Sequence, residues 1–255
     1  MDLVSSVHYK KGFDNAFWNG DQIVYGDGDE DLEEKDRIFS RFTRSIEIIG
    51  HELTHGLIQH EAALVFQGQP GALNESISDV FGSMVKQYQL RQDAVAADWL
   101  VGSNLFYPHM KARGIRSLAE PGNAYDDPIL GRDPQPSHMR EYNDQPADNG
   151  GVHINSGIPN HAFYLLATRL QGYAWEKAGL IWYHAVCDSL QPLSNFQQMA
   201  NTTYTQAGVI FGKNSLEQQT VRQAWYDVGL QAEEIIPGKG CSGNIGEIIQ
   251  RFSRK

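Results

Sequence analysis

The chain has 255 residues, of which 41% are apolar and 20% are charged, so it can bury a full core without disulfide or metal staples. No run approaches the roughly 20 apolar residues that a membrane span needs. A formal net charge of −10 argues against nucleic acid or an anionic membrane as the main partner, because both attract clustered Lys and Arg. These values favour a soluble protein that acts on a small molecule, a peptide or another protein.

Residues 3–26 alternate apolar and polar positions between glycines, with aromatic and β-branched side chains, which is typical of short paired strands. From Ile38 onward the apolar spacing becomes helical. We predict helices over residues 45–60, 74–92, 158–171, 174–190, 195–211 and 214–228. The expected fold class is therefore α+β, with a short β segment followed by a mainly helical domain.

Three segments do not follow this pattern. Residues 107–156 are rich in Pro and Gly without a clear period, which predicts a long irregular segment with a functional role. Beyond Leu230, residues 237–244 read as a linker and residues 245–252 as a short amphipathic helix. The first 18 residues contain no apolar stretch after a basic one, so the chain as given predicts no secretory signal.

The chain contains two cysteines, Cys187 and Cys241, which are too few for a disulfide framework and lack CxxC spacing. We expect two ordinary thiols. Their number and spacing leave the redox compartment undecided.

The segment GHELTHGL, residues 50–57, carries His51 and His55 four residues apart, with Glu52 beside the first. On an α-helix such histidines share one face, so both imidazoles can bind one metal ion while Glu52 lies near the ion without binding it. The same spacing also fits two surface histidines on an amphipathic helix. Because a catalytic zinc normally has three protein ligands, the choice depends on a third donor downstream.

The next predicted helix offers that donor within ALNESISDVFG, residues 72–82. Glu75 can complete the ligand set. Asp79 lies four residues later on the same face, where it can accept a hydrogen bond from the outer nitrogen of a ligating imidazole. Asn74 is a further polar neighbour in this second layer. The two segments together predict a zinc site made by His51, His55 and Glu75.

These motifs resemble the thermolysin-like family of zinc metalloproteases, which are secreted neutral endopeptidases of the gluzincin type. The resemblance rests on NAFWNG (15–20), VYGDGD (24–29), HELTHGLIQ (51–59), GALNESISDVFG (71–82), IRSL (115–118) and DNGGVHINSGI (148–158). It extends to QAWYDVGL near residue 230. It implies an N-terminal β segment and cleft edge at 1–44, a zinc-binding catalytic domain at 45–230, and an extension at 231–255.

The resemblance also implies the catalytic roles. Glu52 is expected to be the general base, and His153, oriented by Asp148, to be a donor to the oxyanion. The family has a tyrosine as a second oxyanion donor where this chain has Phe66, which cannot donate. We therefore expect an active enzyme with reduced turnover.

Substrate contacts follow from the same resemblance. Asn15 and the backbone of Ala16 are expected to pair with an extended peptide, and Arg116 to contact a peptide carbonyl. The pocket for the residue after the scissile bond is expected to contain Phe39, Phe42, Ile48 and Ile115. Phe42 and Ile48 are larger than is usual in the family, which favours a narrower pocket, although core packing alone explains each of these residues equally well.

Calcium sites are usual in the family, but this chain departs from their pattern. The acidic positions are occupied by Lys86, Leu100, Ser103 and Arg113, and the remaining carboxylates are Glu47 and Asp98. We expect calcium binding to be absent or reduced. We predict that Lys86 pairs with Glu47 and Asp98 where relatives place calcium.

Relatives also carry a further β-rich lobe before the position of Met1. The expectation is a naturally shortened form, or one that lost this lobe by processing or design, with that lobe or a propeptide as a partner. The main function predicted is a zinc endopeptidase acting on peptides or unfolded proteins, secreted as its relatives are, with cytoplasmic synthesis as the alternative. The alternative function is a catalytically weakened zinc protein that binds peptides.

Overall fold

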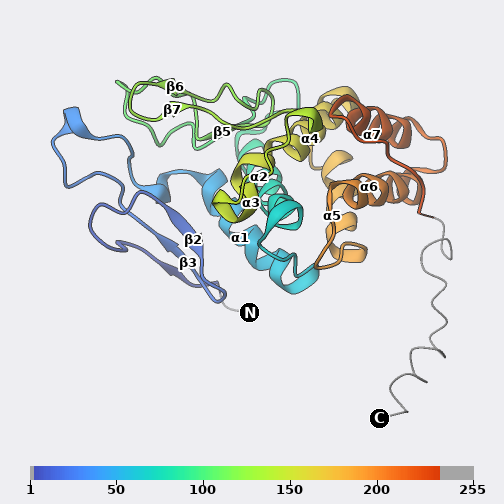
Figure 1. Ribbon diagram of the computed structural model, residues 1–255, viewed down its shortest axis with the longest axis horizontal. Coiled ribbons are helices and arrows are strands. Elements are labelled where there is room, and N and C mark those ends of the chain that lie inside the picture. Colours follow the sequence, from blue (N-terminus) through green and yellow to red (C-terminus); the bar gives the residue numbers. More distant parts are fainter. Residues whose placement is uncertain (1–2, 236–255) are drawn as a thin grey trace, which may run out of the picture.

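The computed structural model describes residues 3–235, which form a short N-terminal sheet followed by a mainly helical body (Figure 1). The sheet contains β1 (Ser5–Ser6), β2 (Ala16–Trp18) and β3 (Ile23–Tyr25). Its order is β1-β3-β2, with β3 parallel to β1 and antiparallel to β2. The prediction of short paired strands is confirmed. Because β2 is an edge strand, one side of its backbone is free to face the body of the protein.

The predicted helices are present within residues 3–235, and their bounds agree to within a few residues except at one start. They are α1 (Ile46–Glu61), α2 (Gly68–Leu90), α4 (Gly157–Leu170), α5 (Ala178–Asp188), α6 (Phe196–Phe211) and α7 (Leu216–Asp227). Helix α2 begins six residues earlier than predicted. Pro70 lies in its first turn, where proline is tolerated because those N–H groups have no partner inside the helix.

The irregular segment predicted at 107–156 is only partly irregular. It contains β5 (Arg116–Ser117), which pairs with β4 (Leu100–Val101), and the pair β6 (Asp126–Asp127) and β7 (Gly131–Arg132). It also contains α3 (Ala147–Asn155), which the sequence did not predict. Residues 148–151 of α3 have left-handed backbone angles. Asp, Asn and Gly tolerate this conformation, so the segment lacks a right-handed helical period.

Helices α1 and α2 form the most extensive packing contact in the molecule and lie at its centre (Figure 1). Their backbones approach closely because glycines face each other. A Cβ added to Gly82 would lie 2.3 Å from the carbonyl oxygen of Glu47, and one added to Gly50 would lie 3.0 Å from the Cα of Gly82. Side chains on both sides of this contact are therefore close enough to form hydrogen bonds and ion pairs with side chains of the partner helix.

Helices α3, α4, α5 and α6 also contact α2. Helix α4 contacts α2 and α7, and α5 and α6 pack together at the end of the molecule away from the β2–β3 hairpin (Figure 1). Trp182 of α5 and Trp225 of α7 are fully buried and stack at 5.9 Å between ring centroids. Burial of these rings removes a large apolar surface from water and so stabilises this end of the molecule.

Some predictions cannot be compared with the fold. The predicted linker at 237–244, the predicted helix at 245–252 and Cys241 lie outside the described residues, and the domain bounds at 44 and 230 stay predictions. Cys187 is a half-buried free thiol. Among the helices of residues 3–235, none has the length and apolar character needed to cross a membrane.

Candidate metal centre

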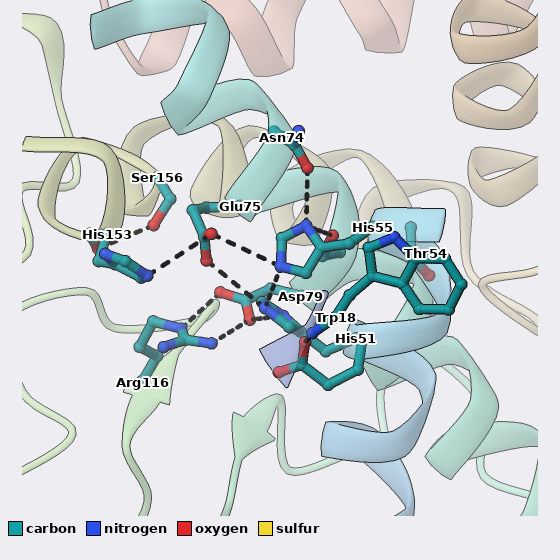
Figure 2. Close-up of polar contacts among 12 residues, drawn as sticks. Trp18, His51, Thr54, His55, Asn74, Glu75, Asp79, Arg116, His153 and Ser156 are labelled. Carbon is teal, nitrogen blue, oxygen red and sulfur yellow. Dashed lines mark hydrogen bonds and ion pairs between the residues drawn. The ribbon is translucent and has the colours of Figure 1, made fainter. Parts of the chain in front are cut away.

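Helix α1 and helix α2 bring His51, His55 and Glu75 together (Figure 2). The two imidazole Nε2 atoms lie 3.0 Å apart, and carboxylate oxygens of Glu75 lie 3.5 Å from that of His51 and 3.6 Å from that of His55. Zinc bonds of 2.0–2.1 Å in tetrahedral geometry separate neighbouring ligand atoms by about 3.3 Å. The ligand atoms predicted from the sequence are thus spaced as a zinc ion requires.

The chemistry of these side chains also fits a cation. Glu75 Oε2 is buried and has no hydrogen-bond partner within residues 3–235. Burial opposes a charge on His51, but the carboxylates of Asp79 and Glu75 beside it raise its pKa to about 10. Burial raises the pKa of Glu75, yet the imidazole of His51 and the other neighbouring histidines lower it to about 2. The cluster therefore attracts positive charge, and two histidines with one carboxylate are a common catalytic zinc set.

Each of the two candidate ligand histidines also forms a hydrogen bond through its second ring nitrogen, Nδ1. The Nδ1 of His51 lies 2.8 Å from Asp79 Oδ1, and the Nδ1 of His55 lies 2.7 Å from Asn74 Oδ1 (Figure 2). A bound zinc ion would take the place of the proton on His51 Nε2, so that Nδ1 would be the donor in each bond and both Nε2 atoms would be unprotonated. Burial lowers the pKa of His55, which favours this neutral form. The second-layer placement predicted for Asp79 and Asn74 matches these contacts.

Asp79 connects the metal centre to the far wall of the cleft. Its carboxylate accepts hydrogen bonds from Arg116 Nε at 2.7 Å and Nη2 at 2.6 Å, and from Asn160 Nδ2 at 2.9 Å. Burial raises the pKa of Asp79, but Arg116 and His51 hold it well below its usual range. Asp79 thus carries a permanent charge that fixes both His51 and Arg116. The contact with Asn160 was not predicted, because 81 residues separate the two in the sequence.

A cleft of about 700 Å³ opens over the metal centre, and Glu52 lies in its wall. Glu52 is only 6% exposed, and its Oε2 accepts the backbone N–H of Trp18 at 2.9 Å. A buried carboxylate beside the ligands but outside the ligand set is suited to accept a proton in the cleft. Glu52 therefore lies in the cleft beside the candidate ligands, and its role as general base stays a prediction.

His153 stands on the opposite side of the ligands and depends on the left-handed turn of α3. Asp148 Oδ1 lies 2.6 Å from His153 Nδ1, and Asp148 Oδ2 accepts the backbone N–H of His153 at 2.8 Å. The other ring nitrogen lies 3.5 Å from Glu75 Oε1, and the side chain is 50% exposed. The ring of Phe66 lies 6.0 Å from that of His153 and 6.3 Å from that of His55, measured between centroids. Phe66 therefore borders the site without a hydrogen-bonding group.

The predicted substrate contacts all line the cleft. These residues are Asn15, Ala16, Phe39, Phe42, Ile48, Ile115 and Arg116. Phe42 and Ile48 are only 3% and 5% exposed, so they belong to the core as well as to the pocket. The Asn15 side chain accepts the backbone N–H of Ala16 at 2.9 Å, which orients the start of β2.

The sequence analysis did not single out every residue of the cleft, and the polar or aromatic ones that it missed include Asp14, Trp18 and Gln59. Gln59 carried a usable signal, since it continues the four-residue spacing of His51 and His55 on the same helix face. Burial and the nearby charge of Asp29 raise the pKa of Asp14 to about 6. No sequence pattern marks Asp14, because its neighbour depends on how two loops meet.

A second charged cluster lies across the Gly50–Gly82 contact. Lys86 Nζ bonds both oxygens of Asp98 at 3.0 and 2.9 Å and Ser103 Oγ at 2.9 Å, and lies 3.5 Å from Glu47 Oε1. It also donates to the carbonyl of Leu100 at 3.2 Å. The predicted ion pairs of Lys86 are present.

Arg113 was grouped with these positions in the sequence analysis. It lies elsewhere in the structure, where its guanidinium donates to exposed Glu120 and to the carbonyl of Asn123. It takes no part in the Lys86 cluster.

Comparison with known proteins adds independent observations. A family model described as the thermolysin metallopeptidase catalytic domain matches residues 1–59, and one described as the thermolysin metallopeptidase alpha-helical domain matches residues 62–230. An extracellular metalloprotease of Pectobacterium carotovorum is 50% identical over 92% of this chain and 65% of its own length. The protease PrtS of Photorhabdus is 49% identical over 92% of this chain and 62% of its own length.

A solved structure shows the same fold. The precursor of protealysin, a metalloproteinase from Serratia proteamaculans, is 54% identical, with a TM-score of 0.84 over 89% of this chain and 68% of that one. The chain spans just under two thirds of the length of the two curated relatives.

Proposed function

This chain belongs to the thermolysin family of metallopeptidases, and from that premise we propose that it is a zinc-dependent endopeptidase. The observation that carries the proposal is the convergence of His51, His55 and Glu75 on one point in a cleft that also contains Glu52. The site thus combines a ligand set for zinc with a carboxylate that is free to move a proton. Peptides and unfolded proteins are the proposed substrates.

Zinc, when bound, supplies a Lewis acid that lowers the pKa of water and polarises a carbonyl group. Glu52 takes the proton of the attacking water and returns it to the nitrogen of the leaving amine. The Trp18 N–H donates to Oε2 of Glu52, which leaves Oε1 without that bond. His153, with Nδ1 bonded to Asp148, donates from Nε2 to the developing oxyanion when the ring is protonated.

Substrate selection follows from the apolar wall of the cleft. Phe39, Phe42, Ile48 and Ile115 form a pocket beside the metal centre. We propose that this pocket receives the residue after the scissile bond, so that cleavage occurs on the amino side of bulky apolar residues. Asn15 and the backbone of β2 pair with the extended peptide, and Arg116, fixed by Asp79, contacts a peptide carbonyl.

Export from the cell is part of the same proposal. The Pectobacterium relative is named an extracellular metalloprotease, and the solved relative is a precursor. Secretion and processing from a longer form are thus the proposed context for this chain. The alternative function, peptide binding without catalysis, has no support among relatives that carry protease names.

The proposal is tested with an internally quenched peptide that has a bulky apolar residue after the scissile bond. Wild-type protein holding one zinc is expected to cleave it, and a chelator is expected to stop cleavage. Glu52→Gln is expected to keep zinc and to lose about 10²–10⁴-fold in kcat, because the general base is gone. If zinc-loaded wild type is no faster than Glu52→Gln, the endopeptidase proposal is wrong.

A further inference from the structure

Helix α1 carries a third polar residue in line with its metal ligands. Gln59 follows His51 and His55 at four-residue spacing and lines the same cleft. It is not part of the ligand set. Its amide instead reaches across to the β2–β3 hairpin, where Oε1 accepts the indole N–H of Trp18 at 2.8 Å and Nε2 donates to the carbonyl of Gly20 at 3.2 Å.

Trp18 contacts α1 at two further points. Its ring lies against Gly56, where an added Cβ would meet the nearest ring atom at 3.2 Å. Its backbone N–H donates to Glu52 Oε2 at 2.9 Å, and the side chain of Trp18 extends over α1 in Figure 2. Glu52, Gly56 and Gln59 lie on one face of the helix, so a single residue of the hairpin is held along two turns of α1.

The sheet is small. Strands β2 and β3 have three residues each and β1, which pairs with β3, has two, so the position of β2 depends on contacts with the rest of the protein. The free edge of β2 is the strand proposed to pair with substrate, and Trp18 in that strand orients the proposed general base. Movement of the hairpin would therefore disturb both substrate binding and proton transfer.

We propose that Gln59 is a positioning residue that ties the β2–β3 hairpin to α1 and so holds Trp18 on Glu52 and the β2 edge in place for a peptide. The inference rests on the proposed endopeptidase function. Gln59 is expected to affect KM because it positions strand β2 for the peptide. It is expected to affect kcat because it positions Trp18 on Glu52. Neither effect requires contact with zinc.

The test compares Gln59→Leu, which keeps the side-chain bulk and removes both hydrogen bonds, with wild type. Two neutral hydrogen bonds together change an equilibrium by about tenfold, so a KM increase of that order is expected, with kcat lower by a few-fold. Zinc content and the thermal midpoint are expected to stay at wild-type values. Gln59→Glu keeps the acceptor for Trp18 and is expected to restore most of the activity. The control is His60→Ala, an exposed neighbour on α1, which is expected to have no effect.

A double-mutant cycle connects Gln59 to Trp18. Trp18→Phe removes the indole N–H and also part of the ring contact with Gly56, so it is expected to lower kcat/KM on its own. Adding it to Gln59→Leu is then expected to cost less than the product of the two single effects. Nitrogen–proton NMR of the indole group, assigned with Trp18→Phe, gives a readout that needs no substrate. Its hydrogen exchange is expected to be slow in wild type and Gln59→Glu and fast in Gln59→Leu.

Several results would overturn this assignment. Unchanged kinetics in Gln59→Leu would show that the tether is dispensable, and fully multiplicative effects in the cycle would show that Gln59 acts independently of Trp18. Loss of zinc or a lower thermal midpoint in parallel with activity would show a role in folding alone. These outcomes compare variants with an active wild type, so they differ from failure of the proposed function, in which the wild type itself is inactive.

Discussion

Helices α1 and α2 contribute to two charged clusters, one on each side of the Gly50–Gly82 contact, and the clusters obtain their positive charge differently. In the candidate metal centre, His51, His55 and Glu75 offer three ligand atoms, and the proposed cation is a zinc ion taken from solution. The other cluster contains Lys86, whose ammonium group is part of the chain. Buried carboxylates need a cation in either case, because an unpaired charge is costly in a low-dielectric interior.

The two clusters also differ in whether their polar groups already have partners within the chain. Lys86 Nζ donates to oxygens of Asp98, Leu100 and Ser103 and lies beside Glu47, so the hydrogens of its ammonium group have acceptors within the chain. In the metal centre Glu75 Oε2 has no partner within the described residues, and a cleft opens over the ligands. One helix pair thus contains a closed cluster suited to stability and an open cluster suited to chemistry.

The largest expected effect comes from removing a ligand of the open cluster. Glu75→Gln keeps the size of the side chain and removes its charge. Loss of an outer partner of a ligand already weakens metal binding by about 10–100-fold, so loss of a ligand is expected to weaken zinc binding by at least about 100-fold. Competition with a chromophoric chelator measures the affinity. Glu61→Gln, an exposed glutamate at the end of α1, is the control and should bind zinc normally; equal affinities for both variants would remove Glu75 from the ligand set.

The next effect comes from the closed cluster. Lys86→Met retains the apolar stem and leaves the carboxylate of buried Glu47 without its cation. We expect the free energy of unfolding to fall by about 3 kcal/mol, measured by urea denaturation, with zinc content unchanged. Lys213→Met is the matched control, because that lysine pairs with Glu234 on the surface and should leave the urea midpoint unchanged. A similar small effect for both lysines would contradict the role of Lys86.

A smaller effect tests whether Lys86 replaces an ion. Lys86→Glu would place a third carboxylate beside Glu47 and Asp98 and should make the protein respond to calcium. If calcium then binds with a Kd near 10⁻⁴ M, 10 mM calcium adds about 2.7 kcal/mol of stability. Thermal melting with and without calcium measures the change. Wild type should not respond, and a similar calcium response in wild type would show that a calcium site persists beside Lys86.

The smallest expected effect is on the rate of the reaction that we propose for the metal centre. Phe66→Tyr adds a hydroxyl group beside His153 and His55. A second donor to the oxyanion is expected to raise kcat by up to about tenfold, which corresponds to about 1.4 kcal/mol. Steady-state kinetics with the quenched peptide measure it, and Phe66→Leu serves as a control for the loss of the ring. No gain in Phe66→Tyr would mean that the other donors already satisfy the oxyanion.

Local spacing in the sequence was enough to predict the central features of the metal centre. His51 and His55 are one helical turn apart, and Glu75 and Asp79 are likewise one turn apart, so their faces follow from helix geometry alone. Glu52 is adjacent to the first ligand. These relations are short in sequence, and the helices that carry them are strongly periodic.

Only the tertiary structure decided the contacts between elements that are distant in the sequence. The left-handed turn that places Asp148 under His153 has no helical period, and the bonds of Asp79 to Asn160 and of Gln59 to Trp18 span 81 and 41 residues. Such contacts depend on how closely two backbones approach, as at Gly50 and Gly82. The sequence by itself therefore determined which groups can bind zinc, and the packing of α1 against α2 and the β2–β3 hairpin decided which residues hold those groups in place.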